Sequence, residues 1–158
     1  SNSMSLSRNS AKVQAYLDQF GLKLEVQELS QSTRTAQDAA DAVGCELGQI
    51  VKSLVFQTGT SPLLFLVSGK NQLNITKVSE TLNSEIEKAD AEFARDQTGF
   101  PIGGVPPVAH EKPIEVFIDR DLLDYEDVWA AAGTPNAVFR IKSKDLPLIT
   151  NGRILDVS

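Results

Sequence analysis

The stretch from Ile50 to Ser68 constrains the fold more than any other part of this chain. Residues 50–57 and 63–68 are two runs of β-branched and large apolar residues, separated by the turn sequence TGTSP. Runs of this length and composition predict two adjacent strands that return on each other. Since both runs are apolar on both faces, we expect them to be central strands of a sheet.

Further helices and strands are predicted on both sides of this pair. Helical spacing and end signals indicate helices at residues 8–20, 35–43 and 90–98, in ITKVSETLN, in YEDVWAAAG and, as a short turn, in SKDLPLI. Strands are expected at residues 22–29, 114–119 and 136–141 and in the closing RILDV. This mixture, without strict alternation, predicts an α+β or mixed α/β fold and not a doubly wound parallel sheet.

The 158 residues are enough for one domain with a sizeable core. Residues 1–3 precede a methionine and are interpreted as a cloning remnant, which leaves residues 4–158 as a single domain. No apolar run approaches the roughly 20 residues of a membrane span, and no secretory signal precedes the first helix. Together with a single cysteine, these features lead us to expect a cytoplasmic protein without membrane contact.

Composition also narrows the functional classes. A net charge of −6 disfavours DNA or broad non-specific nucleic-acid binding but leaves room for RNA held at a small patch. One cysteine and one histidine cannot form a usual zinc site, so no metal is expected. A Ser-His-Asp hydrolase would need His110, and no G-x-S-x-G elbow is present. Cys45 is interpreted as a small buried residue in preference to a reactive thiol, and the acidic run from Asp119 to Asp127 as a solvated helix entry in preference to a metal site.

Lys52 stands out because it lies among large apolar residues in the first strand of the central pair. Alternation of side chains puts it on one face with Ile50, Leu54 and Phe56. A lysine there is costly unless its ammonium reaches water, an anion or a polar pocket. It either extends to solvent near the strand end or places a cation at the floor or rim of a cleft, where it could hold a phosphate or carboxylate or stabilise developing negative charge.

The stretch TGFPIGGVPPVAH, Thr98 to His110, is dense in residues with special backbone properties. Glycines 103 and 104 allow a ligand to approach the backbone closely, and prolines 106 and 107 stiffen the other end. The stretch is either a connecting loop or a rigid array of N–H groups that can bind a carbonyl oxygen or an oxyanion.

Lys52 in its strand and the stretch from Thr98 to His110 together resemble the pattern of the YbaK/EbsC family, also called the prolyl-tRNA synthetase-associated domain. The resemblance runs from about Val13 to Val157 and is carried by GCELGQIVKSLVF, LLFLVSGKNQLN, TGFPIGGVPPVAH and AAGTPNAVFRI. It implies a single domain whose central mixed, largely antiparallel and barrel-like sheet is flanked by helices. Two positions depart from the family pattern: Ser53 replaces the asparagine of some alanine-specific relatives, and Ala109 or His110 replaces a glycine.

The resemblance implies a trans-editing aminoacyl-tRNA deacylase, which hydrolyses the ester that joins a wrong amino acid to the tRNA 3′ end. Lys52 would hold the terminal adenosine, and the loop from Gly103 and Gly104 to Pro107 would frame the aminoacyl carbonyl. No cofactor or protein nucleophile is implied, because a ribose hydroxyl or the substrate's own side chain can assist. The partners would be the tRNA acceptor end and an aminoacyl-tRNA synthetase, and the implied substrate-binding residues are Ser53, Val105, Pro106, Pro107 and Asn136.

Two other functions remain open on the sequence. One is a non-catalytic module that uses the same cleft to bind a nucleotide, an amino acid or a protein. The other is a conventional hydrolase with His110 as the base, whose pH profile would follow a group near 6.5.

Overall fold

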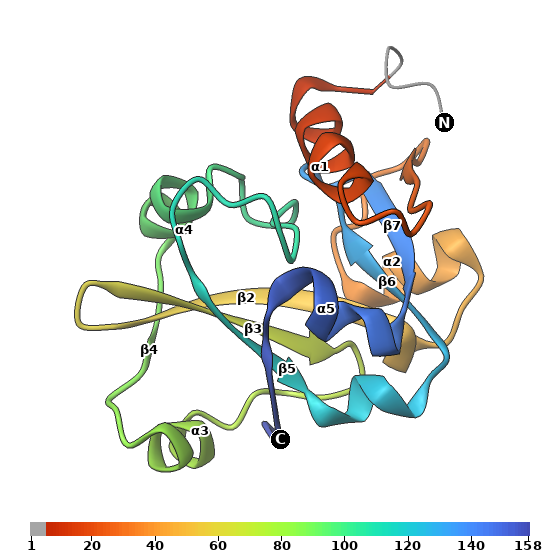
Figure 1. Cartoon of the computed structure of the whole chain (residues 1–158). Helices are drawn as coiled ribbons and strands as arrows, with labels where there is room; N and C mark the ends of the chain where they lie inside the picture. The colour runs from red at the N-terminus through yellow and green to blue at the C-terminus, as the bar shows by residue number, and fades with distance from the viewer. Residues whose placement is uncertain (1–5) are drawn as a thin grey trace.

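The two strands predicted between residues 50 and 68 form the middle of the sheet (Figure 1). The structure, a computed structural model, describes residues 6–158, so the expected cloning remnant at residues 1–3 lies outside the described residues. Strands β2 (Ile50–Thr58) and β3 (Ser61–Ser68) pair antiparallel along their length. Residues 63–68 of β3 are all buried, which confirms the expected central position.

Eight strands make up one mixed sheet in the part of the chain that is described. Three pairs are parallel (β2 with β6, β3 with β5, β5 with β8) and four are antiparallel, which confirms the mixed architecture. The other strands are β1 (Val26–Glu28), β4 (Glu87–Lys88), β5 (Glu115–Asp119), β6 (Asp127–Ala131), β7 (Ala137–Lys142) and β8 (Arg153–Leu155).

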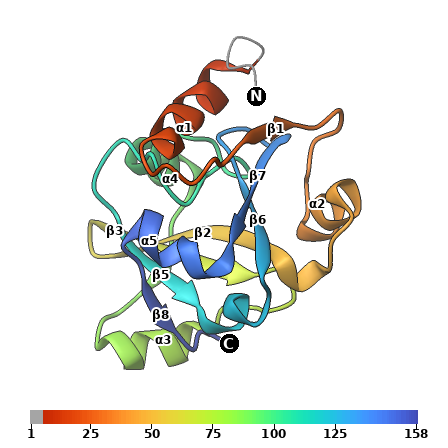
Figure 2. The ribbon, with the colours of Figure 1, turned by 45° about the vertical axis from the view of Figure 1, so that its right-hand side comes forward.

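The sheet does not close into a barrel, so the barrel-like expectation is wrong. The strands follow the order β1-β7-β6-β2-β3-β5-β8, and the two ends of this path do not pair with each other. Strands β1 and β8 lie far apart at the two edges (Figure 2) and have only three residues each. Closure requires every strand to be paired on both sides, and these two short edge strands do not meet.

Helices flank the sheet where the sequence predicts most of them. Thr35 and Asp38 form the predicted capping box at the start of α2, and Asp90 and Gly99 begin and end α4 as expected. Among the described residues, no helix combines the length and apolar character of a membrane span. The helices are α1 (Arg8–Asp18), α2 (Ala36–Val43), α3 (Ile75–Leu82), α4 (Ala91–Thr98) and α5 (Leu146–Thr150), with short 3₁₀ turns η2 (Leu47–Gln49), η3 (Arg120–Asp124) and η4 (Ser143–Asp145).

The helix expected in YEDVWAAAG is wrong, because residues 127–131 form strand β6. Val128 and Ala130 are buried while Trp129 and Ala131 are partly exposed, which is the two-residue period of a strand. β6 pairs with β7 on one side and with the start of β2 on the other. These tertiary pairings override the helix propensity of the alanines.

Two further differences concern short strands. Only residues 26–28 of the expected strand 22–29 are in the sheet, and Lys23 has a positive φ of 56°. The two-residue strand β4 is not predicted by the sequence, because a segment this short has no detectable periodicity.

The two faces of the central strands pack into separate apolar cores. Val51 and Val55 of β2 belong to the core that also contains Val105. Phe56 belongs to the core on the other face, where the rings of Phe65 and Phe117 stack 5.1 Å apart. Alternate residues of β2 therefore face opposite sides of the sheet, which decides how the candidate site is divided.

Candidate functional site

The candidate site lies where strand β2 lacks a neighbour. β2 pairs with β3 along its length, but on its other side it pairs only at residues 50–51 with β6 and at residues 56–57 with β4. Within residues 6–158, the stretch from Lys52 to Leu54 therefore has no strand partner on that side, and the Val55 carbonyl accepts from the Ala89 N–H at 3.2 Å, next to β4. The Ile50 carbonyl accepts from the Gly69 N–H, which follows β3, so the main-chain groups of Ile50 point toward β3. Main-chain groups of successive residues alternate in direction along a strand, so those of Ser53 point away from β3, into the gap.

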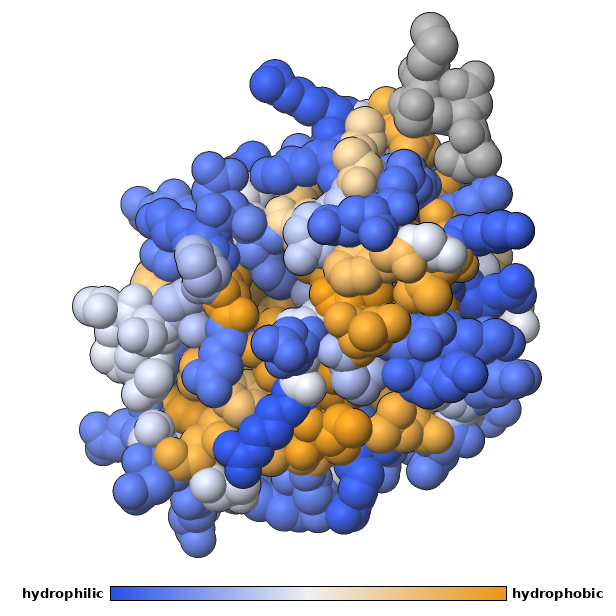
Figure 3. All heavy atoms as spheres, in the orientation of Figure 1, coloured by the Kyte–Doolittle hydropathy of each residue, from blue (hydrophilic) through white to orange (hydrophobic). Residues whose placement is uncertain are grey.

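A groove follows this gap. It consists of two adjoining cavities of about 350 and 420 Å³. The two cavities share five lining residues, Lys52, Ser53, Leu54, Ile102 and Val105. The space-filling view of the molecule shows apolar side chains in a band across the middle of one face, surrounded by hydrophilic ones (Figure 3). The groove thus brings the lysine strand and the glycine and proline loop together, as the sequence predicts.

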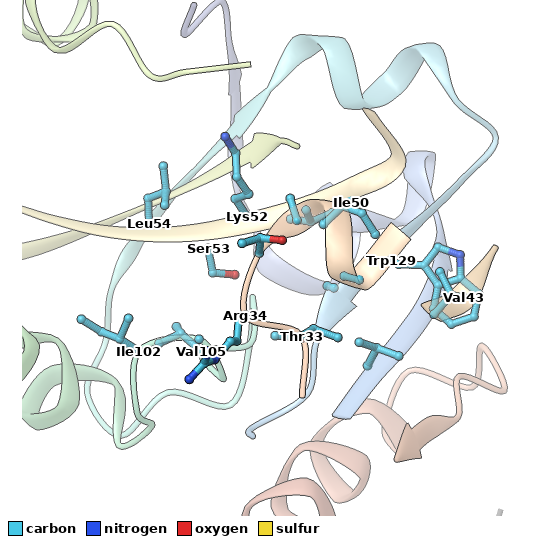
Figure 4. A pocket seen from close by; sticks show the side chains of 18 residues that line it. Thr33, Arg34, Val43, Ile50, Lys52, Ser53, Leu54, Ile102, Val105 and Trp129 are labelled. Carbon is cyan, nitrogen blue, oxygen red and sulfur yellow. The ribbon is translucent and has the colours of Figure 1, made fainter. Parts of the chain in front are cut away.

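Lys52 and the loop nevertheless lie on different sides of β2. The side chains of Lys52 and Leu54 point to one side of the strand, and Ser53 points to the other, toward Val105 and Ile102 (Figure 4). The Lys52 ammonium is half-buried and donates a hydrogen bond to the carbonyl of Asn71. Burial lowers the pKa of Lys52 from its ordinary value, and the nearby Asp119 carboxylate opposes this shift.

The carboxylate of Asp119 holds this arrangement and is buried, so the expectation of a solvated run is wrong at this residue. Asp119 is only 1% exposed. One of its oxygens accepts from the Ser68 N–H at 3.0 Å and the Asn71 side-chain amide at 2.9 Å, and the other accepts from the Asp121 N–H at 2.9 Å. Asn71, whose carbonyl receives Lys52, is thereby fixed. In the described part of the chain, the acidic run brings no three potential metal ligands together.

The two glycines of the loop have different surroundings. Gly103 lines the groove with a positive φ of 90°. Gly104 packs against backbone: a Cβ there would lie 2.8 Å from the nitrogen and Cα of Thr134. Its N–H donates to the Pro101 carbonyl at 2.9 Å, and its own carbonyl accepts from the Gly133 N–H at 2.8 Å. Gly104 therefore positions the loop, and Gly103 is the glycine next to the groove.

The end of the loop lies outside the groove. Val105 lines the groove, but Pro107 and His110 line a separate cavity. His110 Nε2 lies 2.7 Å from the Pro106 carbonyl, which can only accept, so the ring donates there. Burial lowers the pKa of His110, and this bond partly offsets the effect. Ala109 has a φ of 68°, in the left-handed region that favours the glycine of the family pattern.

Asn136 also lies outside the groove and belongs to a turn that connects its walls. Its side-chain amide donates to the Leu29 carbonyl at 3.2 Å, and its oxygen accepts from the Thr134 hydroxyl at 3.0 Å. In the same turn, the Pro135 carbonyl accepts from the N–H and the hydroxyl of Thr33, at 2.7 and 2.5 Å. Since Gly133 holds the glycine loop, this one turn positions both the loop and the segment before α2.

Three other polar groups bear on the chemistry of this region. Arg34, which no sequence motif distinguishes, reaches the groove from the segment before α2 (Figure 4). The hydroxyl oxygen of Ser53 is buried at the groove without a hydrogen-bond partner among the described residues. Cys45 is only partly buried, so the expectation of a buried residue is wrong, and it lines neither cavity of the groove. Its thiol donates to the Glu46 carbonyl at 3.3 Å, and partial burial and the Glu46 charge raise the pKa of the thiol. A raised pKa disfavours the reactive-thiol interpretation.

Comparison with known proteins adds independent information. EbsC of Enterococcus faecalis, named as a candidate Cys-tRNA(Pro)/Cys-tRNA(Cys) deacylase, is 22% identical over 131 residues, which cover 82% of this chain and 80% of that protein. The proline–tRNA ligase of Maridesulfovibrio salexigens is 34% identical over 98 residues, which are 61% of this chain and 17% of the ligase.

A solved structure covers the chain almost completely. A crystal structure described as that of a candidate trans-editing enzyme for prolyl tRNA synthetase superposes with a TM-score of 0.93 and 48% identity, over 98% of this chain and 99% of that one. Residues 30–148, more than half of the chain, match the family model described as an aminoacyl-tRNA editing domain. This stretch contains both walls of the groove, and the chain belongs to the aminoacyl-tRNA editing domain family.

Proposed function

We propose that this protein is a trans-editing deacylase that hydrolyses the ester bond of a mischarged aminoacyl-tRNA. The observation that carries this proposal is the groove at the unpaired stretch of β2, which is lined by both Lys52 and Gly103. Main-chain groups of Ser53 that no strand covers can form hydrogen bonds to polar groups of a ligand held in the groove. Membership of the editing family and the deacylase name of EbsC support the same substrate class.

In this proposal the two walls have different tasks. The Lys52 ammonium holds the terminal adenosine through its phosphate, and the start of the loop, at Gly103 and Val105, frames the aminoacyl carbonyl. Ser53, whose hydroxyl oxygen lacks a partner among the described residues, and Val105 contact the aminoacyl group. Gly104, Pro106 and Asn136 act by holding the loop in place.

Ester hydrolysis in the groove needs stabilisation of charge more than a protein nucleophile. Water attacks the carbonyl carbon, the bond to the ribose oxygen breaks, and that oxygen takes up a proton. The intermediate carries an oxyanion, which fixed backbone N–H groups at the loop stabilise. The neighbouring ribose hydroxyl, or the substrate's own side chain, assists the attack, so neither a metal nor a catalytic triad is needed.

The partners follow from the same chemistry. The substrate is the acceptor end of a mischarged tRNA in the cytoplasm, and an aminoacyl-tRNA synthetase delivers or releases it. Apolar walls sort amino acids by size, but one methylene changes selectivity only by roughly 10- to 200-fold, which is why a second, hydrolytic sieve is useful.

The test is a panel of mischarged tRNAs incubated with the purified protein. We expect hydrolysis of at least one of them, and loss of this activity in Lys52→Ala. Lys144→Ala removes an exposed lysine from η4 and should leave activity unchanged. Thermal unfolding verifies that each variant is folded. Full activity in Lys52→Ala would overturn the assignment, and absence of turnover with retained ligand binding would favour the non-catalytic module.

A further inference from the structure

We propose that Arg34 is a phosphate-binding residue of the groove and contacts a phosphodiester of the tRNA acceptor end on the loop side of β2. The identity of the ligand rests on the proposed function. The placement of the site rests on the geometry of the chain alone.

The cavity around Arg34 has the electrostatic character of an anion site. Its charged lining residues are Arg34 and Lys52, and no aspartate or glutamate among the described residues lines it. This is notable in a chain with 21 acidic and 15 basic residues. A concave surface that carries the Arg34 guanidinium and no carboxylate has a positive potential where a polyanion can enter.

The two cations serve different sides of the strand. The Lys52 ammonium lies on the side of Leu54 and already donates to the Asn71 carbonyl. The Arg34 side chain lies on the side of Ser53, beside Ile102 and Val105 (Figure 4). Arg34 is therefore the cation that shares a side with the glycine loop, where the proposed ester lies.

Hydrogen bonds fix the backbone on both sides of Arg34. Before it, Thr33 makes two bonds to the Pro135 carbonyl, at 2.7 and 2.5 Å. After it, the Thr35 hydroxyl accepts from the Asp38 N–H at 3.0 Å, and the Asp38 carboxylate accepts from the Thr35 N–H at 3.3 Å. The guanidinium itself is exposed and has no hydrogen bond or ion pair with any residue of the described chain. The backbone is thus positioned in advance, and the charge is free for a ligand.

The chemistry of the substrate selects phosphate as that ligand. The α-carboxyl group of the amino acid is a neutral ester with the ribose, and the fixed anions of the acceptor end are its phosphodiesters. A guanidinium presents a planar fork of donors that matches two phosphate oxygens, and it stays charged at any physiological pH.

The experiment measures binding of an RNA minihelix that ends in CCA and carries no amino acid, by fluorescence anisotropy over a range of salt concentrations. We expect Arg34→Ala to raise the Kd roughly tenfold at low salt, the loss of one charge-assisted contact. The slope of log K against log salt should become shallower by about 0.7 to 1, as for one phosphate fewer. Arg34→Lys should keep the slope, with an intermediate Kd. Arg153→Ala, at an exposed arginine of the edge strand β8, is the matched control and should change neither quantity.

Each outcome decides the proposal. Equal effects of Arg34→Ala and Arg153→Ala, or no binding of the minihelix by the unaltered protein, would overturn it. A change in Kd without a change in slope would show that Arg34 acts through packing and would overturn it too. Deacylation is scored separately: an Arg34-dependent slope without turnover of any mischarged tRNA would retain this inference and reject the proposed function.

Discussion

At the scale of single residues, the environment of Lys52 explains how a lysine is tolerated in a central strand. The ammonium donates a hydrogen bond to the Asn71 carbonyl. The side-chain amide of Asn71 in turn donates to Asp119, which lies 48 residues from Asn71 in the sequence. Burial of the ammonium is costly, and the nearby carboxylate offsets part of that cost. The support for the candidate site is therefore a small buried polar network that no local pattern reveals.

Replacing Asp119 with asparagine should loosen this network. The carboxylate accepts three N–H groups, whereas an amide turns its own NH₂ toward at least one of those donors. We expect the free energy of unfolding to fall by about 1–3 kcal/mol and deacylation to fall with it, because Lys52 loses its fixed acceptor. Urea unfolding and a deacylation assay measure both. Asp124→Asn, at an exposed position of η3, is the control, and equal stability of the two variants would contradict the network.

His110 should give the protein a pH-dependent stability. Burial and the Lys12 ammonium lower its folded-state pKa, so the unfolded chain takes up the proton first as the pH falls. The contribution of His110 is fully present above its unfolded pKa of about 6.5 and is lost as the pH falls from there through the lowered folded pKa. Urea midpoints measured from about pH 8 down to about pH 5 should therefore fall more steeply for the unaltered protein than for His110→Gln. Parallel curves would show that His110 does not titrate in this window.

At the scale of elements, the turn that follows β6 is the part that assembles the groove. It accepts from Thr33 through Pro135, and through Gly133 it bonds to Gly104 in the loop. The segments around Thr33 and Gly104, about 70 residues apart in the sequence, are thus both held by the turn at residues 133–136. The loop is stiffened by its own prolines, but its place over β2 is decided by this contact.

Gly104→Ala should therefore lower deacylation strongly, although the substitution adds only one methyl group. The new methyl would meet the backbone of Thr134 at 2.8 Å, so the loop must move away from the turn. We expect a loss of deacylation of roughly 100-fold, the size of effect that a displacement of about 1 Å can have. Gly59→Ala, in the turn between β2 and β3, has a positive φ of 58° and no neighbour within 4 Å, so it should lower stability without lowering activity. Similar losses of activity in the two variants would argue against a positioning role for Gly104.

At the scale of the whole molecule, an acidic chain carries a small cationic groove. The net charge is −6, whereas the charged lining of the groove's first cavity is Arg34 and Lys52. Such a distribution does not attract a whole tRNA, but it does allow the flexible acceptor end to be held. In the proposed function, a synthetase partner would therefore present the tRNA to the groove.

Binding of full-length tRNA should consequently depend only weakly on salt. With about two phosphate contacts on a single-stranded end, the slope of log K against log salt should be near −1.4. Titration of the unaltered protein with tRNA between about 50 and 200 mM salt measures it, a range over which proteins with many phosphate contacts lose orders of magnitude in affinity (roughly 10³–10⁵). A steep slope that reports many contacts would contradict binding at the acceptor end alone.

The sequence by itself determined the elements whose signals are local. The central strand pair between Ile50 and Ser68, the capping box at Thr35 and most helix ends follow from side-chain chemistry within a few residues, and the structure confirms them. That Lys52 and the glycine and proline loop line one groove could also be anticipated, through a resemblance in sequence. The division of β2 side chains between two faces also follows from alternation, but tertiary structure alone decided that residues 127–131 are a strand, that the sheet stays open, and on which side of β2 the glycine and proline loop lies. These features depend on strand pairing and buried hydrogen bonds between distant segments, whose free energy exists only once the chain has folded.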